Sequence, residues 1–86
     1  MIFTKHALAK FKDPAVIKFN VREVDIEKAF NNPEDILDDQ EQGVKLILGK
    51  LDKGHNLRIV YREFGGIIIV ITFHPAKKGR YEKKLF

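Results

Sequence analysis

The sequence predicts an α+β domain in which two N-terminal helices pack on one face of an antiparallel sheet of three or four strands. Apolar residues recur at helical spacing in the first third of the chain, and the pattern changes to strand-like runs from residue 44 onward. The runs 57–64 and 67–73 are joined by Gly65-Gly66, which is a strong β-hairpin signal. Because 86 residues supply surface for one hydrophobic core, we expect a single domain over 1–86.

The two helices have recognisable starts and stops. Thr4 can accept a hydrogen bond from an amide one turn later, so it begins the first helix, and Asp13-Pro14 ends it. After a short connection, apolar residues at i, i+3 and i+4 from Ile26 to Phe30 predict the second helix. Pro33 follows this segment and stops it. The element order is therefore two helices followed by strands.

The strands follow the helices. Ile36-Leu37 is expected to be a short extended piece, and 44–51 a strand in which Gly49 marks a bulge or bend. The run 67–73 is apolar on both faces, so it is predicted to be a central strand. Residues Met1 to Phe3 form a further candidate strand.

Alternation assigns the faces of strand 57–64. Leu57, Ile59 and Tyr61 should face the core, which leaves Arg58 and Arg62 together on the other face. The residue opposite Arg58 depends on the turn. A two-residue loop at Gly65-Gly66 places Phe73 there, and a three-residue loop places Thr72 there.

Charge is distributed unevenly along the chain. Residues 1–43 hold six Lys/Arg and nine Asp/Glu, and residues 44–86 hold ten and three, so the halves carry −3 and +7. A basic half attracts phosphates and favours a nucleic-acid partner. The chain has no cysteine, and its longest apolar run, 67–71, is far shorter than the roughly 20 residues that span a bilayer. We expect a cytoplasmic protein that does not enter a membrane and has no signal peptide.

Four segments together resemble the RelE/ParE toxin superfamily of prokaryotes. They are FTKHALAKF, VREVDIEKAFNNPEDILDD, LRIVYREFGGIIIVITFHP and a basic tail that ends in RY. The nearest resemblance is to a compact, largely uncharacterised RelE-like branch. It implies two helices laid across an antiparallel sheet. It also implies a metal-independent endoribonuclease, an mRNA interferase that cuts mRNA on the ribosome and is held inactive by a cognate antitoxin.

The resemblance implies catalytic roles for Arg58, for Tyr81 and for a basic residue on or after the last strand, which can be Lys77, Lys78 or Arg80. Metal-free RNA cleavage must neutralise charge at phosphorus, which suits the planar guanidinium of Arg58. It must also move protons, and His74 and His6 are candidates because histidine has an ordinary pKa of about 6.5. Candidate RNA-binding residues are Lys50, Lys53, Arg62, Lys77 and Lys78.

A different function on the same fold is left open. The domain can be a non-catalytic module that binds nucleic acid or a protein, including a ParE-like role directed at gyrase. Neither the nuclease nor the binding module is expected to need a cofactor. The three histidines, at 6, 55 and 74, lack the close spacing of a zinc motif, so no metal is expected.

Overall fold

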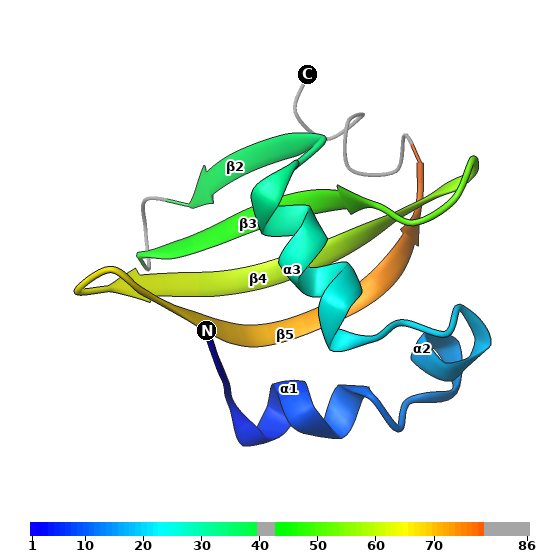
Figure 1. Ribbon diagram of the computed structural model, residues 1–86, viewed down its shortest axis with the longest axis horizontal. Coiled ribbons are helices and arrows are strands. Elements are labelled where there is room, and N and C mark those ends of the chain that lie inside the picture. The colour runs from blue at the N-terminus through cyan, green and yellow to red at the C-terminus, as the bar shows by residue number, and fades with distance from the viewer. Residues whose placement is uncertain (40–42, 79–86) are drawn as a thin grey trace.

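The computed structural model describes residues 1–39 and 43–78, and in these ranges three helices lie on one face of a five-stranded sheet (Figure 1). The helices are α1 (Lys5–Lys10), α2 (Pro14–Lys18) and α3 (Glu23–Asn31). The strands are β1 (Ile2–Phe3), β2 (Asp35–Asp39), β3 (Val44–Lys50), β4 (His55–Phe64) and β5 (Ile67–Lys77). The expected α+β class is confirmed.

The sheet has five strands, not the three or four predicted, and it is mixed, not purely antiparallel. The strand order is β1-β5-β4-β3-β2, and β1 runs parallel to β5, with Ile2 opposite Ile69 and Phe3 opposite Val70. The other three pairings are antiparallel. β4 is the middle strand, and β5 lies between β1 and β4. β5 is therefore an inner strand, and Val70 and Phe73 on its helix side are buried in the core.

The prediction of two helices was also wrong, because the segment after Asp13 forms a short helix of its own. The Asp13 carboxylate accepts a hydrogen bond from the Ala15 amide at 2.9 Å, and Pro14 occupies the first turn, where its missing N–H costs nothing. The predicted start of α1 is confirmed, since the Thr4 hydroxyl accepts from the Ala7 amide at 3.1 Å.

Gly49 allows α3 to lie directly against β3. A Cβ at this position would come 2.4 Å from the Cβ of Ala29, which is closer than real carbon atoms approach. The pairing of β3 with β4 continues without interruption through Gly49, so there is no bulge at this position. The glycine serves helix packing instead.

Three strands are longer than predicted. β4 begins at His55, two residues before the predicted start at Leu57. The Ile36-Leu37 piece extends to a complete edge strand, β2, and β5 continues past Pro75 to Lys77. Pro75 is tolerated because β1 pairs with β5 only at Ile69 and Val70, which leaves that edge of β5 without a partner among the described strands.

The core lies between the helices and one face of the sheet. Leu57, Ile59 and Tyr61 are buried there, as alternation predicted. Phe73 of β5 is fully buried, and its ring centroid lies 4.8 Å from that of Phe11. This face is therefore committed to packing. None of the helices in the described ranges combines the length and hydropathy needed to cross a membrane.

Candidate functional site

The face of the sheet opposite the helices carries the predicted arginine. We call it the helix-free face, and its central residues come from β3, β4 and β5: Leu46, Leu48, Asn56, Arg58, Val60, Thr72 and His74. On this face Arg58 of β4 is directly opposite His74 of β5. Directly opposed residues in an antiparallel pair have Cβ atoms about 4.5–5.5 Å apart. The structure therefore brings together two of the predicted catalytic residues, both of them half-buried.

A β-bulge sets this pairing. Gly65 and Gly66 have φ of 56° and 80° and form the predicted two-residue turn, with Phe64 opposite Ile67. From this turn alone Arg58 would face Phe73. The register shifts between Val60 and Tyr61, so both predicted partners of Arg58, Phe73 and Thr72, were wrong.

Thr4 holds the bulge from the helix layer. Its hydroxyl donates a hydrogen bond to the carbonyl oxygen of Ile71 at 2.9 Å, and its amide donates to that of Val70 at 3.0 Å. Ile71 is the extra residue of β5, since Val60 faces Thr72 and Tyr61 faces Val70. The cap of α1 thus stabilises the register that places His74 beside Arg58.

Two polar residues next to this pair were missed in the sequence. Asn56 precedes Arg58 by two residues on the same face and is 5% exposed, and Thr72 precedes His74 in the same way. Within the described residues, Asn56 Oδ1 and Thr72 Oγ1 are buried without a hydrogen-bond partner. A buried acceptor left without a donor costs about 1–3 kcal/mol. Asn56 lay one residue outside the predicted strand, and the face of Thr72 depended on the bulge.

Apolar side chains surround the polar group. Leu48 lies opposite Arg58 on β3 and is 2% exposed. Leu46 lies opposite Val60, and the side chains of Leu46 and Val60 are half-buried. A guanidinium held among apolar side chains interacts more strongly with an anion than one in open water. The helix-free face therefore combines a cation, an imidazole and apolar surface.

The predicted RNA-binding residues are spread over more than one side. Arg62 is exposed on the helix-free face opposite Ile69, and Lys50 is exposed at the end of β3 opposite Asn56. Lys53 is exposed in the β3–β4 turn. These positions extend the basic surface from Arg58 along β4 and toward that turn.

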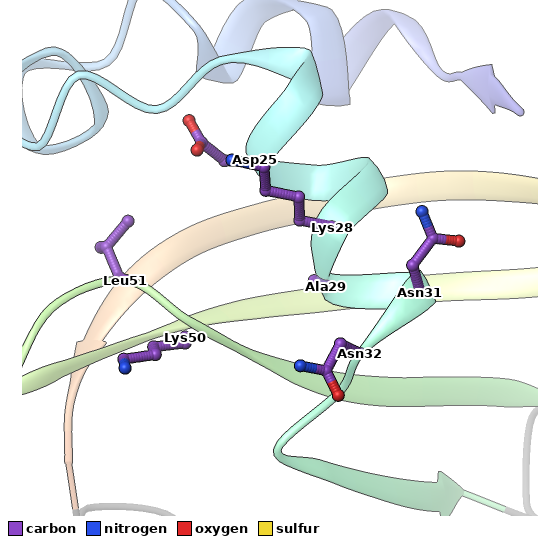
Figure 2. Close-up of a pocket in the computed structure, with 7 residues that line it drawn as sticks. All are labelled: Asp25, Lys28, Ala29, Asn31, Asn32, Lys50 and Leu51. Carbon is purple, nitrogen blue, oxygen red and sulfur yellow. The ribbon is translucent and has the colours of Figure 1, made fainter.

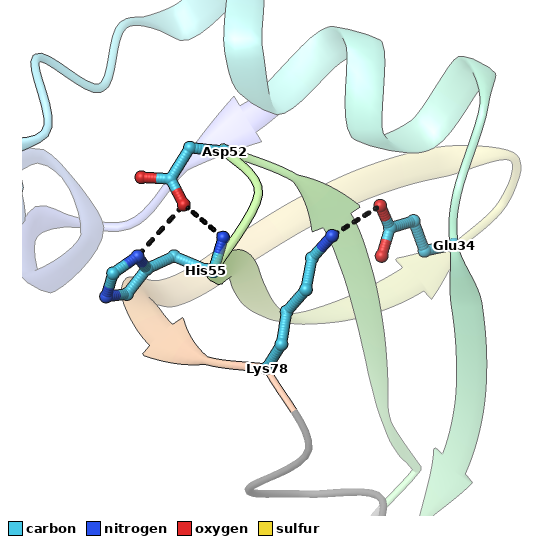
Figure 3. Close-up of polar contacts among 5 residues, drawn as sticks. Glu34, Asp52, His55 and Lys78 are labelled. Carbon is cyan, nitrogen blue, oxygen red and sulfur yellow. Dashed lines mark hydrogen bonds and ion pairs between the residues drawn. The ribbon is translucent and has the colours of Figure 1, made fainter.

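Lys77 and Lys78 have separate surroundings. Lys77 is opposite His55, whose ring contacts Phe19 on the helix side with a centroid distance of 4.6 Å, so Lys77 lies on the side away from Arg58. The Lys78 ammonium lies 3.9 Å from a carboxylate oxygen of Glu34 (Figure 3). Partly exposed ion pairs of this kind contribute little, about 0–1 kcal/mol. Lys78 can therefore exchange Glu34 for another anion.

His6, a further predicted catalytic residue, lies away from the Arg58–His74 pair. It is exposed on α1, whose Ala7 packs into the core on the helix side of the sheet. Arg80 and Tyr81, the remaining predicted catalytic residues, lie outside the described residues.

The β3–β4 turn contains a further polar cluster. Asp52 Oδ1 lies 2.9 Å from His55 Nδ1 and accepts a hydrogen bond from the Gly54 amide at 2.8 Å (Figure 3). The pKa of the Asp52 carboxyl lies below its ordinary value. The main cause is the hydrogen bond with His55, and the second is the hydrogen bond from the Gly54 amide. This cluster shapes the turn that carries Lys53.

Among the described residues, no three His, Cys, Asp or Glu side chains are grouped so that they could hold a metal ion. Arg58 can bind an anion, and His74 can carry a proton.

No family model, curated protein or solved structure matches this chain.

Proposed function

We propose that this protein is a RelE-like toxin that binds RNA on the helix-free face and cleaves it without a metal. The observation that carries the proposal is the position of Arg58 directly opposite His74 on that face. The side chain that binds the phosphate and the side chain that transfers the proton must act on the same phosphodiester, so the two must lie next to each other.

Arg58 is suited to bind the phosphate that is attacked. It lies on the middle strand of the sheet, which restricts its backbone, and its planar fork of N–H donors matches two phosphate oxygens. Negative charge on these oxygens grows in the transition state, and Leu48 and Val60 limit the water that would screen it.

His74 is suited to take the proton of the ribose 2′-hydroxyl. The 2′-oxygen then attacks phosphorus, and the bond to the 5′-oxygen breaks, which leaves a 2′,3′-cyclic phosphate. The 5′-oxygen leaves with a proton from Tyr81 or from water.

An antitoxin is the proposed protein partner. Half-buried Leu46 and Val60 beside Arg58 form a surface on which an acidic and apolar segment can bury side chains while its carboxylates contact the arginine. Such a segment would compete with RNA for the same residues, so inhibition and substrate binding would exclude each other.

A second candidate is a binding module that does not cleave, acting on nucleic acid or on a protein such as gyrase. One specific observation favours it. Of the three histidines, only His74 lies beside Arg58, because His6 and His55 lie on the helix side. Cleavage needs both a base and an acid, so binding requires fewer groups than cleavage does.

The test is incubation of a defined single-stranded RNA, with and without ribosomes, followed by analysis of the product ends. A cyclic phosphate product that is lost in Arg58→Ala and in His74→Ala supports the nuclease. His6→Ala is the matched control and should retain full activity. RNA retention that decreases with salt, without any product, supports the binding module instead. Neither cleavage nor binding would contradict both.

Expression in a prokaryotic host tests the toxin role. Growth arrest with loss of mRNA, relieved by the product of a neighbouring gene, is expected for the wild type. Arg58→Ala should abolish the arrest. Arrest that is equally strong with Arg58→Ala would show that this face is not responsible.

A further inference from the structure

Phe64 is an aromatic residue that the core does not use. It ends β4 on the helix-free face and is 79% exposed, whereas the rings of Phe11 and Phe73 pack against each other on the helix side. Ile67 lies directly opposite Phe64 and is 48% exposed. Figure 1 shows the turn between β4 and β5 extending past the start of β3. Grouped apolar side chains at such a place are typical of an interaction surface.

Arg58, Arg62 and Phe64 form a row along β4. Alternation puts all three side chains, together with that of Val60, on the helix-free face. A strand rises about 3.4 Å per residue, so about 14 Å of backbone separates Arg58 from Arg62, and about 7 Å separates Arg62 from Phe64. The row therefore presents two cations and then an aromatic ring in one direction.

The positive charge at Arg62 is not offset by its neighbours. Arg62 is exposed, and within the part of the chain that the structure describes it takes part in no ion pair. Glu63 follows Arg62 but lies on the opposite face of β4, where its carboxylate is 3.5 Å from the Lys45 ammonium. Arg62 can therefore attract an anion such as a phosphate.

The helix side of the sheet is less suited to a nucleic-acid strand. A hollow of about 410 Å³ lies there between α3 and the end of β3 (Figure 2). The polar ends of Lys28, Asn31 and Asn32 point away from one another in this hollow, so they do not form a joint contact for one phosphate (Figure 2). The row on β4 is the better track.

We propose that Phe64 stacks on a base of the RNA and that Arg62 contacts a second phosphate, so that the strand runs along β4 from Arg58 toward the β4–β5 turn. The inference rests on the proposed RNA substrate and specifies the form of RNA that binds. Proteins that bind single strands combine cations along the backbone with aromatic rings on which bases stack. Bases inside a duplex stack on each other and are not accessible to such a ring. The RNA is therefore single-stranded where it meets Phe64.

A fluorescent probe at position 64 tests the stacking. The chain has no tryptophan, so Phe64→Trp introduces a unique indole. The whole protein with this substitution is titrated with a single-stranded RNA octamer, and a saturable loss of fluorescence is expected because stacked bases quench the indole. Ile17→Trp is the matched control, since Ile17 is also apolar and 60% exposed but lies on α2. Equal quenching at both positions, or bound RNA without quenching at position 64, would overturn the proposal.

Affinity measurements separate this inference from the proposed function. Phe64→Ala should weaken octamer binding about tenfold, as expected for the loss of one stacked base, and Phe64→Tyr should retain the affinity. Urea denaturation checks that both variants are folded. If Arg58→Ala weakens binding and Phe64→Ala does not, the RNA site at Arg58 stands and the contact at Phe64 is wrong. If the wild type binds no RNA, the proposed function and this inference are both contradicted.

Gel filtration tests another use of the exposed ring. The wild type and Phe64→Ala are expected to elute at the same volume. A wild-type dimer that Phe64→Ala converts to a monomer, without a change in RNA affinity, would show that Phe64 serves self-association instead.

Discussion

Arg58 is directly opposite His74 across β4 and β5, one residue beyond the position that the Gly65-Gly66 turn alone would give. The shift comes from the bulge at Ile71, whose carbonyl oxygen accepts the Thr4 hydroxyl. A contact between the first helix and the last strand thus determines which side chain accompanies the arginine.

Paired cysteines test this register directly. The chain has no cysteine, so Arg58→Cys with His74→Cys should form one disulfide under mild oxidation. Opposed residues have Cα atoms about 4.5–5.5 Å apart, which a disulfide spans without strain. Arg58→Cys with Thr72→Cys is the matched control on the same face, at a diagonal distance of about 7–8 Å. Mass spectrometry and thiol labelling measure the extent of closure. Faster closure of the control pair would show a different register.

Thr4→Val should destabilise the protein and disturb the bulge. The substitution keeps the shape of the side chain and removes the hydroxyl that caps α1 and bonds to Ile71. Each of these two interactions contributes about 1 kcal/mol, so a loss of about 2 kcal/mol is expected in urea denaturation. Thr4→Ser keeps the hydroxyl and should retain most of the stability. Equal losses in both variants would mean that the hydroxyl plays no such part.

Gly49→Ala should destabilise the protein by about 1–3 kcal/mol, because its Cβ would clash with the Cβ of Ala29. Ala29→Gly removes the opposing atom at a cost of about 1 kcal/mol for glycine in a helix. The double variant should therefore be more stable than the sum of the two separate losses predicts, as measured by thermal unfolding. Additive losses would show that the two residues do not share this contact.

Asp52→Asn should lower the melting temperature near neutral pH and have less effect in acid. The pKa of this carboxyl is depressed in the folded state, mainly by His55, so the ionised form stabilises the fold. This contribution is complete above the unfolded-state pKa of about 4 and is lost as the pH falls through the lower folded-state value. Melting curves of wild type and variant should therefore converge below about pH 4. If the difference in melting temperature between wild type and variant stayed constant from neutral pH to below pH 4, ionised Asp52 would not be the source of the stabilisation.

Local patterns were sufficient for much of the fold. The start of α1 at Thr4, the turn at Gly65-Gly66 and the core side of β4 all follow from residues within a few positions of one another. The helix that begins at Pro14 also had a local signal, since Asp13 is a capping residue and proline is favoured in the first helical turn. This signal was interpreted only as the end of α1.

Half of the candidate site followed from the sequence and half did not. The face that carries Arg58 is a consequence of alternation along one strand, which needs no knowledge of the rest of the chain. The nearness of His74, the inclusion of Asn56 and Thr72, and the separation of His6 from the pair depend on how strands and helices meet.

The amino-acid sequence by itself determined the class of fold, the hairpin and the arginine's side of its strand, because hydrophobic spacing and glycine conformation act over neighbouring residues. Only the tertiary structure decided the parallel first strand, the bulge and the hollow beneath α3. Each of these depends on contacts between distant segments, such as Thr4 with Ile71 and Ala29 with Gly49. Such contacts leave no periodic pattern in the sequence, since a single hydroxyl or a single missing Cβ is enough to make them.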